Sequence, residues 1–229
     1  SGGVLYRAGH TEAGCDLATL AGASPASVIC EILNDDGSMA RLPDLLKFSK
    51  KHEIKIGTIA DLIEYRSKKE KLIKKISEEK VNTEFGMMKL IVYSDLLSKN
   101  THLAFVKGEI EKDDEVVVRV HEPLSILDFV SKETPHSWPP LKALKKISNE
   151  KNGVVIFLNY NESQNNITSK LNHENITLKK STDLRSYGIG SQILVDIGVS
   201  KMKLLAAPRK MPSMAGYGLQ VTEFIENDI

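Results

Sequence analysis

Arg7-Ala8-Gly9-His10-Thr11-Glu12-Ala13 is the stretch from which the organisation of this chain can be worked out. Thr11 is a favourable N-cap, and the apolar positions from Ala13 to Ala21 recur at helical spacing before Gly22. The sequence therefore predicts a helix over residues 12–21 that begins directly after a glycine and a histidine.

The expected start of this helix has the features of an anion site. Backbone N–H groups without an intrahelical partner and the positive end of the helix dipole favour an anion there. Arg7 adds a planar guanidinium suited to phosphate, and the imidazole of His10 can ligate a metal. On spacing alone an alternative stays open, in which His10 and Thr11 only cap the helix and Arg7 lies in solvent.

A carboxylate interrupts the next apolar run. Residues 26–33, Ala-Ser-Val-Ile-Cys-Glu-Ile-Leu, predict a buried strand that ends at the turn of residues 34–37. Within such a strand Glu31 needs a partner or a raised pKa, and both conditions are common where acid and base chemistry is done. If Glu31 instead faces water on an edge strand, it is an ordinary surface residue.

Residues 2–13 and 30–41, continued at residues 58–66, closely resemble 3,4-dihydroxy-2-butanone 4-phosphate synthase, a riboflavin-pathway enzyme. The resemblance implies that Glu31 is the acid/base residue and that His10 is a ligand for Mg²⁺ or Mn²⁺. It also implies that the phosphate and neighbouring hydroxyls of the substrate are bound by Arg7, Ala8, Gly9, His10 and Thr11.

By the same resemblance, residues 1–66 are the C-terminal part of that domain. The acidic loop supplying the other metal ligand would then lie upstream of Ser1, and the chain would be a fragment of a longer protein. The implied assembly is a homodimer with sites near its interface.

Composition is that of a soluble globular protein, with 41% hydrophobic and 27% charged residues among 229. A net charge of +1 argues against binding nucleic acid through excess Lys and Arg. The sequence contains no apolar run of 18 residues that would predict a membrane span, so the expected location is the cytosol. Cys15 and Cys30 form neither a disulfide framework nor a zinc pattern, and both are expected to be buried thiols.

The first part of the chain is expected to be an α/β layer with helices packed on a sheet. Pro43 predicts the first turn of a helix that ends in a basic cluster at His52, and residues 54–59 predict a short strand. The helical pattern of residues 59–80 then predicts a charged helical linker, assigned to residues 67–82.

Residues 83–229 predict a second, mixed α+β domain. Strands at residues 87–93, 101–106 and 115–120 suggest an antiparallel meander. Further elements are expected to be helices at 140–149 and ending near 197, and strands at 154–158, 203–205 and 219–224. Residues 159–180, rich in Asn, Ser and Lys, predict a mobile loop.

This second part resembles GTP cyclohydrolase II, through residues 119–121, 183–190, 208–210 and 216–219. That family holds a catalytic zinc with three cysteines, whereas residues 122–138 contain none. The positions at which thiolates would be needed are occupied by Leu124, Pro135 and Ser137. The histidines that remain as conceivable metal ligands are His121 and His136. We therefore expect a degenerate domain without zinc.

Two further motifs of this part have expected structural roles. Asp183 and Arg185 match the family's catalytic pair, but without a metal to activate water they are expected to form a structural ion pair. Gly188-Ile189-Gly190 lacks the third glycine of a dinucleotide fingerprint and predicts a helix start.

Two functions compete on the sequence. In one, the protein is a magnesium-dependent lyase that converts D-ribulose 5-phosphate to L-3,4-dihydroxy-2-butanone 4-phosphate and formate. In the other, it is a non-catalytic scaffold or regulatory subunit that retains part of each fold.

Overall fold

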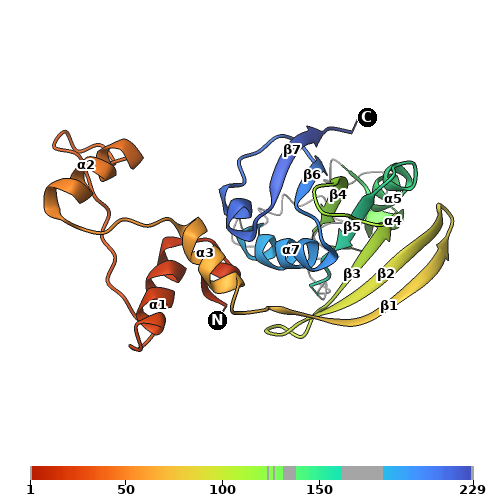
Figure 1. The fold of residues 1–229 in the computed structure, drawn as a ribbon, viewed down its shortest axis with the longest axis horizontal. Helices are drawn as coiled ribbons and strands as arrows, with labels where there is room; N and C mark the ends of the chain where they lie inside the picture. The colour runs from red at the N-terminus through yellow and green to blue at the C-terminus, as the bar shows by residue number, and fades with distance from the viewer. Residues whose placement is uncertain (1, 123, 126, 131–137, 161–182, 228–229) are drawn as a thin grey trace.

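The computed structural model describes residues 2–122, 124–125, 127–130, 138–160 and 183–227. A group of helices comes first, and a larger body built on one mixed sheet follows it (Figure 1). The first group comprises η1 (Gly3–Leu5), α1 (His10–Leu20), α2 (Leu42–His52) and α3 (Ile59–Ser67). The expected mixed α/β class is therefore confirmed.

The helices of the first part begin where their caps place them. Pro43 lies in the first turn of α2, as predicted, and Thr58 caps α3 by accepting a hydrogen bond from the Asp61 N–H at 3.1 Å. The predicted N-cap of α1 is wrong, because the N-cap is Gly9 rather than Thr11 and the helix begins at His10. The helix itself is confirmed.

The strands predicted for the first part are wrong. Residues 26–33 form no strand, their one ladder contact is an isolated bridge between Leu33 and Met39, and Val28 is fully exposed. Residues 54–58 are likewise irregular. The physical reason is the lack of a neighbour, since no strand is assigned anywhere in residues 2–66 and a lone strand has no ladder to join.

The expected helical linker is also wrong. α3 ends at Ser67, and β1 (Ile73–Thr83) replaces helix from residue 73 onward. β1 pairs along its whole length with β2 (Gly86–Asp95), from Ile73 opposite Asp95 to Thr83 opposite Gly86. This hairpin ladder overrides the helical spacing of the isolated sequence.

The sheet has seven strands in the order β1-β2-β3-β5-β4-β6-β7. β1, β2 and β3 (Thr101–Lys107) form an antiparallel meander, and β3 pairs antiparallel with β5 (Gly153–Phe157). β4 (Glu115–His121) lies between β5 and β6 (Lys201–Leu205) and is parallel to both, so the expected meander does not extend to it. β7 (Gln220–Ile225) is parallel to β6.

Helices cover the sheet and complete two cores. α7 (Asp183–Ile197) contributes the buried Ile189, Ile193 and Leu194 to the larger core, which also contains Leu5 and Ile63 from the first part. α5 (Pro140–Ser148) belongs to the smaller core, while α4 (Leu127–Val130) and η2 (Pro212–Tyr217) are short connections. The predicted helix start at Gly188 is wrong, because α7 begins five residues earlier. The predicted loop at 159–180 lies, from residue 161 on, outside the described residues.

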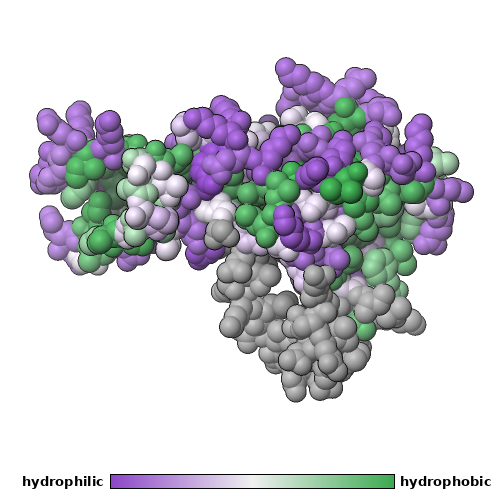
Figure 2. All heavy atoms as spheres, turned by 90° about the horizontal axis from the view of Figure 1, so that it is seen from below, coloured by the Kyte–Doolittle hydropathy of each residue, from purple (hydrophilic) through white to green (hydrophobic). Residues whose placement is uncertain are grey.

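Residues 17–56 contribute little to either core. Exposed large apolar side chains recur along this stretch, at Leu17, Leu20, Val28, Ile29, Leu33, Met39, Leu42, Leu46, Ile54 and Ile56. Figure 2 shows apolar and charged atoms mixed over this end of the molecule. Across the described part of the chain, no helix is long and apolar enough to cross a membrane.

Candidate functional site

The N-terminus of α1 presents backbone donors, as its sequence indicates. Gly9 has extended backbone angles, and the first intrahelical bond runs from the Ala13 N–H to the Gly9 carbonyl at 2.9 Å. The N–H groups of His10 and Thr11 precede that bond and therefore have no intrahelical acceptor. His10 and Thr11 are exposed residues at a helix start, which favours an anion, and the Glu12 carboxylate lies beside Gly9 at the same turn.

Arg7 is held over this turn. Its Nη1 donates to both carboxylate oxygens of Glu12, at 2.8 and 2.9 Å, and the two side chains are partly exposed. Arg7 thus does not lie free in solvent. Because Nη1 makes both bonds, Nε and Nη2 make no hydrogen bond to a described residue and can still bind a phosphate.

Arg7 and Thr11 line one pocket, of about 660 Å³, together with Glu12, Asp16 and Arg66. His10 lines a different pocket, of about 780 Å³, between α1, the start of α3 and the loop before η2. That loop contributes Lys210 from the second part of the chain. The structure therefore brings Arg7 and Thr11 together and places His10 on the neighbouring side of the same helix start.

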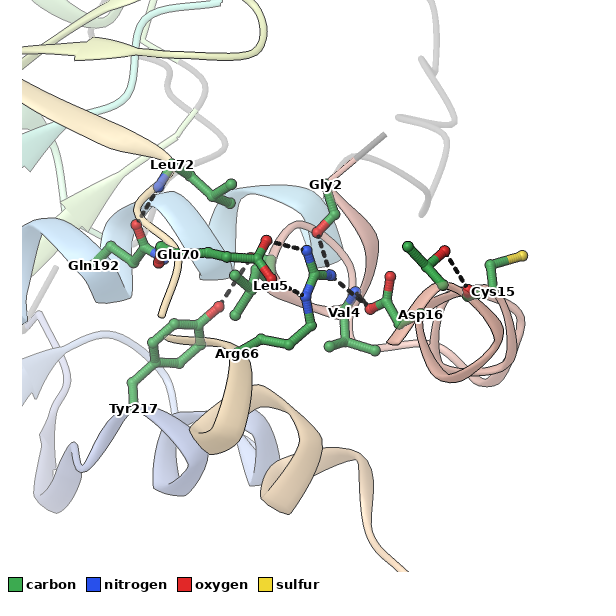
Figure 3. Close-up of polar contacts among 11 residues, drawn as sticks. Gly2, Val4, Leu5, Cys15, Asp16, Arg66, Glu70, Leu72, Gln192 and Tyr217 are labelled. Atoms are coloured by element: carbon green, nitrogen blue, oxygen red, sulfur yellow. Dashed lines mark hydrogen bonds and ion pairs between the residues drawn. The ribbon is translucent and has the colours of Figure 1, made fainter. Parts of the chain in front are cut away.

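Arg66 also lines the pocket that contains Arg7. The sequence did not predict a role for it. Its Nη1 donates to Asp16 Oδ2 at 2.7 Å and to the Gly2 carbonyl at 3.1 Å, and its other nitrogens bind the Glu70 carboxylate (Figure 3). The hydrogen bond to Glu70 raises the pKa of Arg66. Asp16 also accepts the Val4 N–H at 2.7 Å, so one arginine ties η1, α1 and α3 together.

Glu31 is exposed in an irregular segment and lines neither pocket. Its carboxylate makes no hydrogen bond or ion pair with a described residue, so water rather than a buried partner stabilises its charge. Cys30 beside it is exposed and Cys15 is half-buried, which corrects the expectation that both thiols are buried. The structure does not bring Glu31 to the Arg7 turn.

The donors present do not complete a metal site. His10 offers one imidazole, but no group of three His, Cys, Asp or Glu side chains converges within the residues that the structure describes. Mg²⁺ and Mn²⁺ prefer several oxygen ligands. His10 could therefore serve only as one ligand among others.

In the second part, His121 is engaged in a buried pair. His121 is fully buried, with Nε2 at 2.9 Å from Asp128 Oδ2, and Asp128 also accepts the Ser125 N–H. Leu124 offers only its backbone, which donates to the Leu158 carbonyl. Residues 135–137, and the side chains of Asp183 and Arg185, lie outside the described part of the structure.

Arg119 lies beside this pair and is buried. Its Nη1 donates to the Leu205 carbonyl at 2.9 Å, and burial lowers its pKa to about 10. Among the residues described here, the polar side chains are thus an imidazole, a carboxylate and a guanidinium, without a thiolate. This set does not fit a catalytic zinc, which needs three firm protein ligands.

Fold and site together define a chain of two parts, in which helices carrying a candidate anion site precede a mixed-sheet domain. Residues 1–65 match the family model described as 3,4-dihydroxy-2-butanone 4-phosphate synthase, and residues 74–226 match the model described as GTP cyclohydrolase II. The chain belongs to the GTP cyclohydrolase II family and carries a 3,4-dihydroxy-2-butanone 4-phosphate synthase segment ahead of that domain.

Relatives share both parts. A protein named 3,4-dihydroxy-2-butanone 4-phosphate synthase from Neisseria meningitidis serogroup B is 48% identical over 225 residues, covering 98% of this chain and 62% of the relative. The riboflavin biosynthesis protein RibBA of Aquifex aeolicus is 44% identical over 237 residues, covering 97% and 58%. The chain thus spans about 60% of the length of these curated relatives.

One solved structure matches nearly the whole chain. It is the crystal structure of RibBX, a two domain 3,4-dihydroxy-2-butanone 4-phosphate synthase from A. baumannii, with a TM-score of 0.58 and 41% sequence identity. The match covers 99% of this chain and 62% of that chain. The fusion of the two parts is therefore shared with a two-domain protein.

Proposed function

We propose that the protein acts in riboflavin biosynthesis and converts D-ribulose 5-phosphate to L-3,4-dihydroxy-2-butanone 4-phosphate and formate. The observation that carries the proposal is the start of α1, where Arg7 and Thr11 line one pocket at a helix N-terminus. The names of the relatives support this substrate over other phosphates.

The residues of this chain have separate parts in the proposed reaction. Arg7, Gly9 and Thr11 bind the phosphate, and this remote binding energy positions the reacting carbons. Glu31 transfers protons during the rearrangement, which requires its exposed segment to close on the bound sugar. His10 is proposed as one ligand of Mg²⁺ or Mn²⁺. Since the described donors do not complete that site, the metal is proposed only as a requirement of the whole enzyme.

We also propose that the second part does not open the imidazole ring of GTP and holds no zinc. Two features support this: residues 122–138 contain no cysteine, and the His121 imidazole is bonded to Asp128. Ring opening needs a metal-activated water, which a zinc with three firm ligands and one open position would supply.

The proposed setting is a cytosolic homodimer that binds a small sugar phosphate. The dimer rests on the family resemblance, and light scattering of the purified protein at micromolar concentration tests it. A strictly monomeric yet fully active protein would remove the dimer from the proposal.

The decisive assay follows formate release by the complete protein, with D-ribulose 5-phosphate and with GTP as alternative substrates. We expect formate from the pentose phosphate only, loss of that activity after chelation, and recovery with Mg²⁺ or Mn²⁺. An intact protein that releases no formate from ribulose 5-phosphate at saturating metal would favour the non-catalytic scaffold. Formate from GTP together with bound zinc would refute the inactive second part.

A further inference from the structure

The turn that leads into the Arg7 segment lies against the second part of the chain. Leu5, at the end of η1, is fully buried, and its carbonyl accepts the Tyr217 hydroxyl at 2.9 Å (Figure 3). The same carbonyl lies on the backbone of α7 at Gly188, where an added Cβ would come within 1.7 Å of the carbonyl oxygen. Only glycine at position 188 permits this approach.

The Tyr217 hydroxyl is suited to a lasting hydrogen bond with the Leu5 carbonyl. Its side chain is buried, and burial raises the pKa of its phenol, so the hydroxyl remains a protonated donor. A buried carbonyl that accepts no hydrogen bond destabilises the fold. The Tyr217 hydroxyl donates a hydrogen bond to the Leu5 carbonyl. The contact therefore fixes the position of η1 relative to α7 and η2.

η1 transmits that position to Arg7. The N–H groups of Tyr6 and Arg7 both donate to the Gly3 carbonyl at 3.0 Å, so the chain turns directly from Leu5 into Arg7. Gly3 itself has a positive φ of 56°, which favours glycine in this turn. A displacement of Leu5 would therefore move the Arg7 backbone and, with it, the guanidinium over the start of α1.

A second close approach joins the same parts at α3. A Cβ on Gly216 would lie 2.6 Å from the Ala60 carbonyl oxygen and 2.9 Å from a side-chain atom of Ile63, which is fully buried. Ala60 lines the pocket that contains His10. The second part thus contacts the supports of both pockets, through Gly188 and Tyr217 on one side and Gly216 on the other.

We propose that the GTP cyclohydrolase II-like part is a positioning scaffold for the sugar-phosphate site, and that Tyr217 and Gly188 are positioning residues that act through the Leu5 carbonyl on Arg7. This inference rests on the proposed function for its effect on substrate, but the anchoring itself is a property of the fold. It gives the second part a role that requires neither zinc nor GTP.

Two substitutions test the proposal, and each has a matched control. Tyr217→Phe removes the hydroxyl bonded to Leu5, whereas Tyr93→Phe removes the hydroxyl of another buried tyrosine, which donates to Asp196 at 2.9 Å. Gly188→Ala drives a methyl group into the Leu5 carbonyl. Gly190→Ala adds the same methyl to the same helix, where its nearest neighbour is a Val120 methyl at 3.3 Å.

In the complete protein, the KM for ribulose 5-phosphate should rise about fivefold or more in Tyr217→Phe, with kcat changed less than about twofold. Both control variants should keep KM within about twofold. A purely structural role would instead lower the amount of active enzyme, which changes the apparent kcat and leaves KM alone. Unchanged KM in Tyr217→Phe would overturn the proposal.

Hydrogen exchange of the peptide spanning residues 2–9 gives a readout that does not depend on activity. It should become faster in Tyr217→Phe and Gly188→Ala, and stay at the wild-type rate in Tyr93→Phe and Gly190→Ala. If the wild type lacks lyase activity, the proposed function fails while this exchange pattern still tests the anchor. Equal exchange in test and control variants would overturn the anchor itself, and Tyr217→Phe decides the matter if Gly188→Ala does not fold.

Discussion

Replacing Arg66 with methionine should destabilise the first part of the chain strongly. The methionine keeps much of the apolar stem but removes every donor that joins Asp16, Glu70 and the Gly2 carbonyl. Asp16, whose side chain is 12% exposed, would keep, among the described residues, only the Val4 N–H as a donor. Removing one partner of a buried ion pair costs roughly 3–5 kcal/mol, and the exposed Glu70 adds little, so we expect about 3 kcal/mol.

Thermal unfolding followed by far-ultraviolet circular dichroism measures this loss. For a chain of this length about 3 kcal/mol lowers the Tm by roughly 6–12 °C. The control is Lys68→Met on the end of the same helix, where the ion pair with Glu64 is exposed and is worth less than about 0.5 kcal/mol. Arg66→Met combined with Asp16→Asn should recover part of the loss, because the uncompensated carboxylate is gone. The reasoning is refuted if Arg66→Met melts within about 2 °C of the Lys68→Met control.

Four further outcomes follow from the site and the sheet. His10→Ala should abolish formate release from ribulose 5-phosphate while leaving the Tm unchanged, because its side chain is exposed; near-normal turnover at saturating magnesium contradicts its role. Arg7→Lys should raise KM more than it lowers kcat in steady-state assays, since a point charge replaces a planar fork; if neither moves, Arg7 does not bind substrate. Glu31→Gln should lower kcat about 10²- to 10⁴-fold with little change in Tm, and the reverse pattern would make it structural. Burial lowers the pKa of His102 in the folded protein to about 4, below its ordinary value of 6.5. Protonation of His102 therefore favours the unfolded state. The free energy of unfolding should fall by about 3 kcal/mol as the pH is lowered from 6.5 to 4. Denaturant titrations across that range should show a shallower fall in His102→Gln, and identical slopes would exclude His102 as the cause.

Local signals predicted most of the elements. The Pro43 turn and the apolar runs of β2, β3 and β4 are features of neighbouring residues, and these elements formed near their expected bounds. Residues 26–33 failed for the opposite reason, because an apolar run becomes a strand only where another strand accepts its backbone bonds. β1 was missed because most of its residues are exposed on both faces, which hides the alternation expected of a strand.

The candidate site was predicted only in part. The Arg7 turn and the helix after it are contiguous in sequence, and Arg7 and Thr11 line one pocket while His10 lines another. Arg66 and Asp16 are 50 residues apart, and Leu5 and Tyr217 are 212 apart, so no spacing rule could reveal either contact. Lys210 entered the His10 pocket for the same reason, from a loop whose position depends on the whole sheet.

The 212-residue separation between Leu5 and Tyr217 has a consequence for synthesis on the ribosome. Translation proceeds at about 5–20 residues per second, so the turn around Leu5 leaves the ribosome roughly 10–40 s before its anchor. During that interval the Leu5 carbonyl lacks the Tyr217 hydroxyl, and α7 is made only shortly before that hydroxyl. The turn around Leu5 is therefore made well before its anchor, and nascent chains shorter than about residue 217 should leave it open to protease.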